Sequence, residues 1–238
     1  MIEIDFVFLI LNCKKYAYKK EIQKKEWLHK LPDNIVYFHI IGDKQLCGDK
    51  DYILDNNNKI LYVNTKDDYV SLPDKVITAI EAINKNFIYK HLLKTDDDQI
   101  MINEKYFLEV ISQLNDPSHK YNYGGRICVV YRDIFSNYWK YHASIGIDNG
   151  LPKNILLKKT NYCNGRFYTL SYQVTNELIK QKNEIRKYII EDHCIGLHIP
   201  QKYKNKIFVI RNDEIFIDLD KWMKQKKLYF NWSKNLLL

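Results

Sequence analysis

The sequence predicts an α/β protein whose mixed or parallel sheet is covered by helices on both faces. Two observations lead to this prediction. Short, continuous apolar runs alternate along the chain with longer segments in which apolar residues recur at helical spacing. No internal repeat, Gly/Ser-rich linker or Pro-rich stretch divides the 238 residues, so we expect a single domain covering 1–238, long enough to bury a substantial core.

The predicted strands are apolar runs that are short enough to cross a sheet once. They cover residues 4–11, 36–41, 60–63, 87–93, 127–131, 166–170, 207–210 and 215–217. The predicted helices, each with an apolar stripe on one face, cover residues 18–31, 73–83, 104–114 and 173–182. Pro73 and Asp74 mark the start of the second helix, because proline suits the first helical position and an acidic residue suits the positive end of the helix dipole.

The composition is that of a folded protein, with 46% hydrophobic and 14% aromatic residues. The longest clean apolar run, 6–11, is far shorter than the roughly 18 residues that a membrane-spanning helix requires. Glu3 and Asp5 precede this run, whereas a signal peptide has basic residues at that place. We therefore expect a cytoplasmic protein, with no membrane anchor in this chain.

The net charge of +8 comes mainly from lysine, and we attribute it to A/T-rich codons, because Asn, Ile and Tyr are also plentiful. It is therefore weak evidence for nucleic-acid binding. A basic surface still favours anionic partners such as nucleotides. The five cysteines form no C-x-x-C pair, so we expect reduced, buried thiols and no zinc ribbon or redox dithiol.

The acidic triplet Asp96-Asp97-Asp98 directly follows the apolar run 87–93. Carboxylates one residue apart at a strand end point to the same side, where both can reach one hard cation. A divalent cation there would bridge a nucleotide diphosphate and offset the charge that develops as it leaves. Ligands of α/β sheets bind at the carboxyl ends of strands, which favours this interpretation over that of a solvated acidic turn.

A second acidic pair, Glu191-Asp192, follows two isoleucines. This pattern suggests a carboxylate at the wall of a pocket, where a partly buried aspartate has a raised pKa and can act as a base towards a hydroxyl. The alternative is an ordinary helix N-terminus that Asp192 caps, which is common for aspartate.

Lysines cluster after the first predicted strand and could contact a diphosphate, although such lysines more often solvate a helix face. They occupy positions 14, 15, 19, 20, 24 and 25. Neither H-x-x-x-H, G-x-S-x-G nor a P-loop motif occurs, so hydrolase-elbow and P-loop functions lack support.

In their order along the chain, six segments resemble the β-1,3-glycosyltransferases of glycosyltransferase family 31, the galactosyltransferase, N-acetylglucosaminyltransferase and fringe group. The resemblance extends from about residue 7 to 196. The segments are the basic stretch with Lys19, Lys20, Lys24 and Trp27, where lysine replaces the family's arginine; Ile40-Ile41-Gly42; Asp67, Tyr69, Leu72 and Lys75; residues 89–98; residues 162–171; and residues 191–196, where His193 replaces the usual valine.

This resemblance implies a GT-A type, Rossmann-like mixed sheet flanked by helices, a UDP-sugar donor, and Mn²⁺ or Mg²⁺ as cofactor. It implies inverting transfer of a hexose or N-acetylhexosamine to a glycan or glycoconjugate acceptor, in a β-1,3 linkage. A nucleotide-binding part would cover about 1–130, and an acceptor and catalytic part about 131–238. The implied roles are metal ligation by Asp96 and Asp98, general-base catalysis by Asp192, and donor binding by Lys20, Lys24, Asp67, Lys75, Asp96 and Asp97.

The chain departs from the family in two respects. Family members often supply a histidine metal ligand after the E-D-V motif, but here only His198 follows His193, too close to the motif to reach the metal. Family members from animals also carry a membrane anchor and stem, whereas we expect no membrane anchor in this chain.

An aromatic stretch contains Tyr138, Trp139 and Tyr141. These side chains would either stack on a sugar face or belong to the core.

Two functions from other classes compete with sugar transfer. The basic charge, the many tyrosines and an acidic metal site also suit a nucleic-acid-binding or nuclease-like protein, which would bind DNA or RNA in a salt-dependent way. A nucleotidyltransferase would share the acidic metal site but would use a nucleoside triphosphate. The resemblance favours the glycosyltransferase, so we expect no nucleic-acid partner.

Overall fold

The computed structural model describes residues 1–138, 140 and 151–235, and the side chains of these residues as far as 227. Its main sheet is formed by β2 (Phe6–Leu11), β3 (Ile35–Gly42), β4 (Tyr52–Asp55), β5 (Ile60–Val63), β7 (His91–Asp96), β9 (Tyr123–Val130), β12 (Thr160–Ser171) and β13 (Ile207–Val209). The strand order is β13-β9-β12-β7-β2-β3-β5-β4. β2 runs parallel to β3 and β7, whereas β12 runs antiparallel to β7 and β9. The prediction of a mixed sheet is confirmed.

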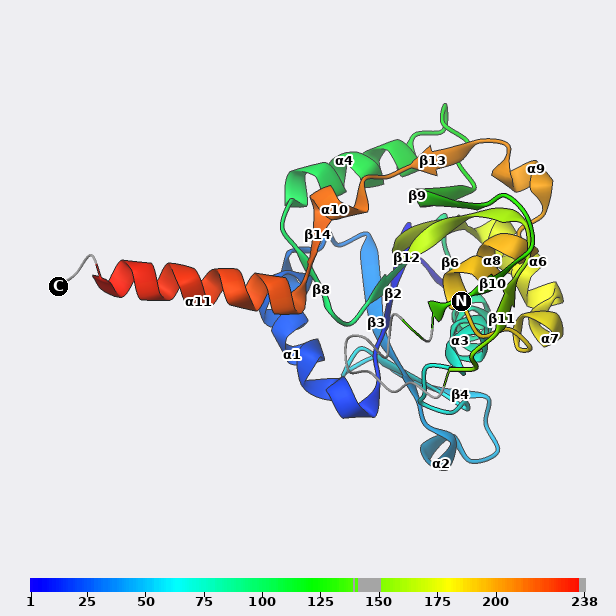
Figure 1. Ribbon diagram of the computed structural model, residues 1–238, viewed down its shortest axis with the longest axis horizontal. Coiled ribbons are helices and arrows are strands. Elements are labelled where there is room, and N and C mark those ends of the chain that lie inside the picture. Colours follow the sequence, from blue (N-terminus) through cyan, green and yellow to red (C-terminus); the bar gives the residue numbers. More distant parts are fainter. Residues whose placement is uncertain (139, 141–150, 236–238) are drawn as a thin grey trace.

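The helices and the smaller sheets surround this sheet (Figure 1). The longer helices are α1 (Ala17–Glu26), α3 (Leu72–Asn86), α4 (Glu104–Asn115), α6 (Tyr172–Lys180), α8 (Glu191–His198) and α11 (Leu219–Asn235). The shorter helices are η1 (Lys14–Tyr16), η2 (Leu28–Lys30), α2 (Lys44–Cys47), α7 (Lys182–Ile185), α9 (Gln201–Lys204) and α10 (Asn212–Ile215). Two-stranded sheets pair β1 (Ile2–Glu3) with β6 (Phe87–Ile88), β8 (Gln99–Met101) with β14 (Phe216–Asp218), and β10 (Ile134–Ser136) with β11 (Ile155–Leu157).

The central strand β2 is buried along its whole length, because a core covers each face of the sheet. Alternate side chains of a strand point to opposite faces. Val7 and Leu9 therefore belong to the core that contains apolar residues of α3, α6 and α8. Phe6 and Phe8 belong to a second core, which contains apolar residues of α4 and the indole of Trp27. The prediction of helices on both faces is thus confirmed.

Several predicted strands are shorter or longer than the observed ones: the predicted strand 166–170, for example, is only the C-terminal part of β12. Two of the other differences have identifiable reasons. The run 87–93 is interrupted, because the chain turns where the backbone N–H groups of Lys90 and His91 both donate to the carbonyl oxygen of Asp5. β7 begins after this turn and extends through Asp96. β9 begins earlier than predicted. Gly124 and Gly125 lie in its first half, and a prediction based on continuous apolar residues does not include them. A Cβ at Gly125 would lie 2.7 Å from the Cβ of Cys163, so this close approach requires glycine.

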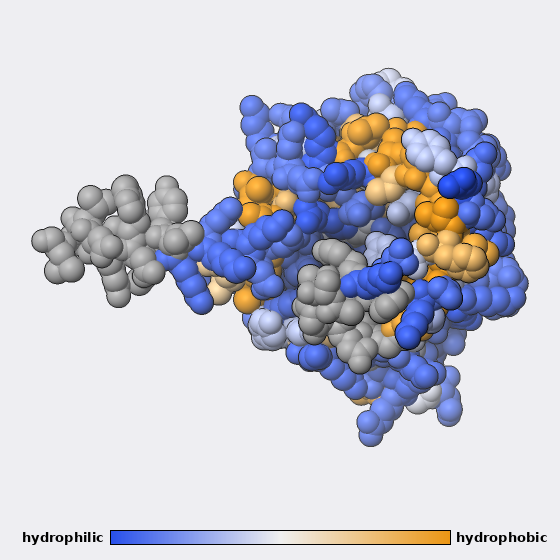
Figure 2. Space-filling model, in the orientation of Figure 1, coloured by the Kyte–Doolittle hydropathy of each residue, from blue (hydrophilic) through white to orange (hydrophobic). Residues whose placement is uncertain are grey.

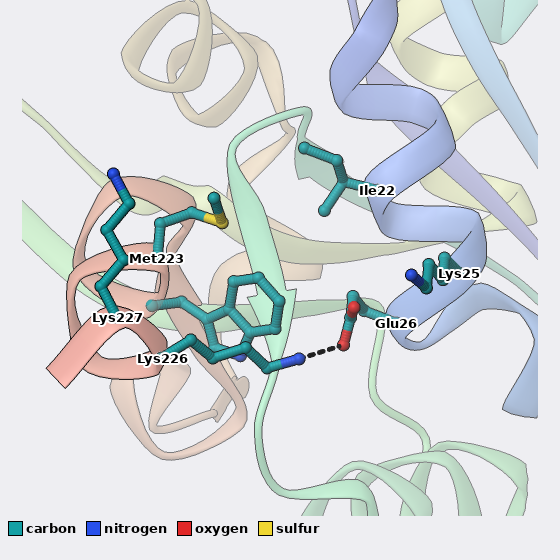
Figure 3. A pocket seen from close by; sticks show the side chains of 7 residues that line it. Ile22, Lys25, Glu26, Met223, Lys226 and Lys227 are labelled. Carbon is teal, nitrogen blue, oxygen red and sulfur yellow. Dashed lines mark hydrogen bonds and ion pairs between the residues drawn. The ribbon is translucent and has the colours of Figure 1, made fainter. Parts of the chain in front are cut away.

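The basic C-terminal segment forms α11, which was not predicted and extends away from the sheet (Figure 1). Its first turns and α1 line an open pocket of about 550 Å³, where Lys226 pairs with Glu26 at 3.0 Å (Figure 3). The pocket is lined by Ile22, Lys25, Glu26, Trp222, Met223, Lys226 and Lys227. Across the described residues, none of the helices is both long and apolar enough to cross a membrane.

A band of hydrophobic residues lies on the surface over the region of β13, β9 and β10 (Figure 2). Phe135 of β10 and Leu156 of β11 are directly opposite each other in the ladder, and both side chains are exposed. Beneath them, Ile155 and Leu157 pack with Val130 in a small third core. These strands therefore bury one face and leave an apolar outer face.

Candidate active site

The acidic triplet lies at the carboxyl edge of the central parallel strands. Asp96 is the last residue of β7 and is paired in register with Leu11, the last residue of β2. Asp97 and Asp98 form the turn into β8. The buried side chain of Gln23, from α1, donates to the carbonyl oxygens of Asp96 and Gln99 at 3.1 and 2.9 Å. This bracing fixes the turn at the place where α/β sheets bind ligands.

The C-terminal segment holds the other side of the same turn. β14 pairs antiparallel with β8, and the N–H of Leu219 donates to the carbonyl oxygen of Asp98 at 2.6 Å. Asp218 accepts hydrogen bonds from Gln99 at 3.2 Å and from Arg166 of β12 at 2.5 Å. The turn is therefore supported by segments from both ends of the chain.

Two carboxylates of the triplet have lysine partners. Asp96 Oδ1 lies 2.7 Å from Lys94 Nζ, and Asp97 Oδ1 lies 3.0 Å from Lys19 Nζ. Desolvation by the surrounding protein raises the pKa of the half-exposed Asp96 to about 6, with Lys94 opposing the increase and the charge of Asp98 adding to it. Burial also raises the pKa of Asp97 to about 7, against the effect of Lys19. The crowded negative charge is thus only partly compensated.

The triplet fits a divalent cation that is shared with a ligand. Within the described part of the chain, no three His, Cys, Asp or Glu side chains are arranged to hold a metal ion. His193 Nε2 lies 2.8 Å from the carbonyl oxygen of Lys158, and His198 Nδ1 lies 2.9 Å from that of Cys194, so these rings have other partners. The half-exposed carboxylates of Asp96 and Asp98 are the hard oxygen ligands that Mn²⁺ and Mg²⁺ accept alongside water and phosphate oxygens.

Asp192 is a buried carboxylate in the first turn of α8. Its Oδ2 accepts a hydrogen bond from the N–H of Gly165 at 2.8 Å, and its Oδ1 accepts one from the N–H of His193 at 2.7 Å. Burial raises its pKa, whereas the two backbone N–H groups lower it. Ile190 occupies the N-cap position of α8, so the alternative in which Asp192 caps this helix does not match the structure.

Lys94 joins the two acidic segments. Its side chain is buried, and Nζ lies 2.7 Å from Asp96 Oδ1, 2.7 Å from the carbonyl oxygen of Gly165 and 3.3 Å from Glu191 Oε2. The other oxygen of Glu191 accepts a hydrogen bond from the hydroxyl of Tyr168 at 2.5 Å. Burial acts to lower the pKa of Lys94, but the charges of Asp96 and Glu191 outweigh it and raise this pKa.

Asp67 and Lys75 pair with each other and organise the neighbouring strand ends. Lys75 Nζ lies 2.5 Å from Asp67 Oδ1 and donates to the carbonyl oxygen of Asn12 at 3.1 Å. Asp67 also accepts from the N–H of Gly42 at 3.1 Å and from that of Lys14 at 2.7 Å. The pair therefore ties the ends of β2 and β3 together at this edge. Direct contact of either side chain with a donor stays a prediction.

Lys20 and Lys24 are not brought to the triplet. Both lie near Glu21 on α1, with nitrogen–oxygen distances of 3.6 and 3.5 Å. Lys19 and Gln23, which are one helical turn apart, instead occupy the face of α1 that contacts the triplet. If the contact of Gln23 with the triplet were known, helical periodicity would identify Lys19 as the lysine on the same face of α1. The sequence pattern alone does not reveal that contact. Donor contacts of Lys20 and Lys24 stay predictions.

Two tyrosines, Tyr69 and Tyr162, lie near enough to Asp192 for its charge to act on them. Burial raises the pKa of Tyr69, and the charges of Asp192 and Asp96 contribute to the increase. Burial likewise raises the pKa of Tyr162, again with a contribution from Asp192. Tyr138 packs against the third core. Trp139 and Tyr141, the other residues of the predicted aromatic stretch, lie outside the described residues.

Comparison with known families identifies the class of protein. Residues 19–205 match the sequence model of the family described as galactosyltransferase. The chain belongs to the galactosyltransferase family. The prediction of a glycosyltransferase is therefore confirmed, and the match begins at Lys19 and includes the triplet, Lys94 and Asp192.

Solved structures with similar folds share little sequence with this galactosyltransferase-family chain. The glycosyltransferase GlyE of Streptococcus pneumoniae TIGR4 is 8% identical, with a TM-score of 0.42, over 88% of this chain and 46% of that one. The chain thus spans less than half the length of GlyE. A 2-C-methyl-D-erythritol 4-phosphate cytidylyltransferase of Francisella tularensis is 12% identical, with a TM-score of 0.45, over 96% and 99% of the two chains.

Mouse xyloside xylosyltransferase 1 is 8% identical to this chain, with a TM-score of 0.39, over 88% of this chain and 85% of that one. A comparison with the sequences of curated proteins found no match.

Proposed function

We propose that this galactosyltransferase-family protein transfers a hexose or N-acetylhexosamine from a UDP-sugar to an acceptor hydroxyl, with inversion and in a β-1,3 linkage. The acceptor would be a glycan or glycoconjugate. The observation that carries the proposal is the joining of two chemically different carboxylates, Asp96 and Asp192, through Lys94 and Gly165. One is a half-exposed carboxylate at a strand end, and the other is a buried carboxylate held by backbone N–H groups.

Asp96 and Asp98 would hold Mn²⁺ or Mg²⁺ beside the diphosphate of the donor. A bound divalent cation supplies positive charge that offsets the negative charge of a departing nucleotide diphosphate. Lys19 contributes a further cation to the same turn. These groups would orient the donor and favour the charge distribution of the transition state.

Asp192 would accept the proton of the acceptor hydroxyl. The raised pKa of a buried aspartate makes its carboxylate a stronger base than an exposed one. The N–H groups of Gly165 and His193 fix the orientation of the carboxylate before the acceptor arrives. Such preorganisation lowers the cost of reaching the reactive geometry.

The decisive experiment measures Mn²⁺ and UDP binding together. With only two protein carboxylates available, Mn²⁺ alone should bind weakly, and saturating UDP should strengthen its binding markedly. Reciprocity then requires Mn²⁺ to strengthen UDP binding by the same factor. Calorimetric titration of each ligand with and without the other measures this coupling, and a thermal-shift screen of UDP-sugars with Mn²⁺ selects the donor.

Two outcomes of this experiment would contradict the proposal. Equal Mn²⁺ affinity with and without UDP would mean that the protein alone completes the metal site. Stabilisation by nucleoside triphosphates or by nucleic acid, and by none of the UDP-sugars, would indicate a nucleotidyltransferase or a nucleic-acid-binding protein.

A further inference from the structure

We propose that Lys94 is a positioning residue that sets the separation between the donor-side carboxylate Asp96 and the base Asp192. This inference rests on the proposed function, because it assigns Lys94 a part in aligning the two halves of that reaction.

The contacts of Lys94 are two hydrogen bonds, to Asp96 Oδ1 and to the carbonyl oxygen of Gly165, and an ion pair with Glu191. An ammonium group has three N–H donors. Lys94 Nζ has three acceptors within reach, Asp96 Oδ1, the carbonyl oxygen of Gly165 and Glu191 Oε2, and the side chain is only 3% exposed. A buried cation with its donors committed in this way has little freedom to move. It is therefore suited to fixing three chain segments relative to one another.

Glu191 connects the ammonium group of Lys94 to helix α8. It is the first residue of that helix, and its two oxygens are held by Lys94 and by the hydroxyl of Tyr168. Tyr168 lies opposite Lys94 in the ladder between β12 and β7. The start of α8 is thereby attached to two adjacent strands of the sheet. Since Asp192 is the next residue of α8, its position follows from this attachment.

Gly165 provides a second and shorter connection. Its carbonyl oxygen accepts from Lys94 at 2.7 Å, and its N–H donates to Asp192 Oδ2 at 2.8 Å. A Cβ built at Gly165 would lie 3.5 Å from Lys94 Nζ and 3.4 Å from Asp192 Oδ2, so all three groups are in close packing. One residue of β12 thus links the ammonium that holds Asp96 to the N–H that orients the base.

Electrostatics explain why a lysine is suited to this place. Lys94 is surrounded by Asp96, Glu191 and Asp192, whose charges all act on it. Without the ammonium, three carboxylates would remain close together in a buried region and would repel one another. A buried ion pair is weak evidence for stability, because desolvation offsets the attraction, but it can specify one arrangement.

The test replaces Lys94 by methionine, which keeps the length and volume of the side chain and removes the ammonium. The matched control is Lys182→Met. Lys182 lies on α7 and pairs with Glu81 of α3, away from the acidic triplet and Asp192. For both variants, kcat and the donor KM are measured per folded molecule. Amide hydrogen exchange of the Gly165 and His193 N–H groups provides a readout that is independent of activity.

Lys94→Met should lower kcat about a hundredfold, with a donor KM within a few-fold of wild type, because a displacement of about 1 Å in a reactive group has an effect of that size. Exchange of both amides should become at least about tenfold faster. Lys182→Met should change neither quantity. If Lys94→Met fails to fold, Glu191→Gln, which keeps the shape of the side chain, should show the same pattern with a smaller loss of kcat.

A purely structural role of Lys94 would lower the melting temperature and leave kcat per folded molecule within threefold of wild type. That result would overturn the inference.

The proposed function fails separately, if the wild-type protein turns over no UDP-sugar. In that case the exchange rates decide whether Lys94 holds Asp192: unchanged rates would refute the link, and faster rates would uphold it.

Discussion

Lys19 and Asp97 form an ion pair of 3.0 Å that joins α1 to the turn between β7 and β8. The pair places a lysine of the basic cluster beside the acidic triplet, on the helix face that also carries Gln23. Lys20 and Lys24, on other faces of α1, lie near Glu21 instead. The ion pair therefore distinguishes among lysines that the sequence alone leaves equivalent.

Lys19→Ala should weaken Mn²⁺-dependent UDP binding by about tenfold, equivalent to about 1.4 kcal/mol, because it leaves one more carboxylate uncompensated next to the diphosphate. Lys24→Ala, on the same helix, should weaken it less. Calorimetric affinities for UDP in saturating Mn²⁺ measure both effects. A larger loss in Lys24→Ala would favour the donor contact that the sequence suggested for Lys24.

Asp98→Ala should abolish the Mn²⁺-dependent part of UDP binding and leave the melting temperature of the metal-free protein nearly unchanged. The carboxylate is half-exposed in the turn into β8, where Gln99 donates to its Oδ1 at 2.7 Å, and its proposed role is to hold the cation. Calorimetry with Mn²⁺ and UDP measures the first effect, and thermal unfolding in EDTA measures the second. A variant that binds both ligands as tightly as wild type would refute metal ligation by Asp98.

Asp192→Asn should keep the donor affinity of the wild type and lose transfer activity. The amide preserves the shape of the side chain but cannot accept the proton, and loss of a general base lowers rates by roughly a hundredfold to ten-thousandfold. Initial transfer rates at saturating donor and a separate UDP titration measure the two properties. Turnover close to that of wild type would show that another group acts as the base.

In the metal-free protein, Asp96 and Asp97 should contribute a stability that decreases as the pH rises from about 4 to about 7. Desolvation raises the pKa of Asp96 to about 6 and that of Asp97 to about 7. Over this range the folded protein retains protons on these two carboxyls that the unfolded chain has released, so their contribution to the free energy of unfolding falls with rising pH. The buried His39 and His91, whose pKa values burial lowers to about 3 and about 4, act in the opposite direction, so the carboxyl contribution is measured as a difference between variant and wild type.

Thermal unfolding in EDTA across this pH range measures the trend. Asp97→Asn serves as the comparison, because it removes one of the two titrating carboxyls and leaves the histidines unchanged. The melting temperature of the variant relative to that of the wild type should therefore increase as the pH rises from about 4 to about 7. A difference that stays constant over this range would contradict the raised pKa of Asp97.

Elements with a strong local pattern could be predicted from the sequence. The run 60–63 is the observed β5, and the predicted helix 104–114 is α4 within one residue. β4 was not predicted, because its apolar run of three residues, 52–54, lies between Asp51 and Asp55, and the strand is a half-buried edge strand that pairs only with β5. Its existence depends on a partner strand and not on its own composition.

The residues that we propose for the site can be selected from short motifs in the sequence, but the contacts that connect them cannot. Asp96, Asp98 and Asp192 stand out as carboxylates after apolar runs. The contact between Lys94 and Glu191 depends on the register of β12 against β7 and on the position of α8. Neither can be derived from spacing along the chain, because both result from packing between distant segments.

The attachment of Leu219 and Asp218 to the turn of the triplet has a consequence for how the protein matures during synthesis. A chain emerges from the ribosome with its N-terminal part first, so β7 and the triplet are made long before β14. Until residues 216–219 have emerged, Asp98 and Gln99 lack the hydrogen bonds that these residues supply. The galactosyltransferase family match ends at residue 205, so a fragment cut at that boundary would include every residue predicted to be catalytic and omit the segment that supports the turn of the acidic triplet. The turn of the triplet therefore gains these contacts only after residues 216–219 have left the ribosome.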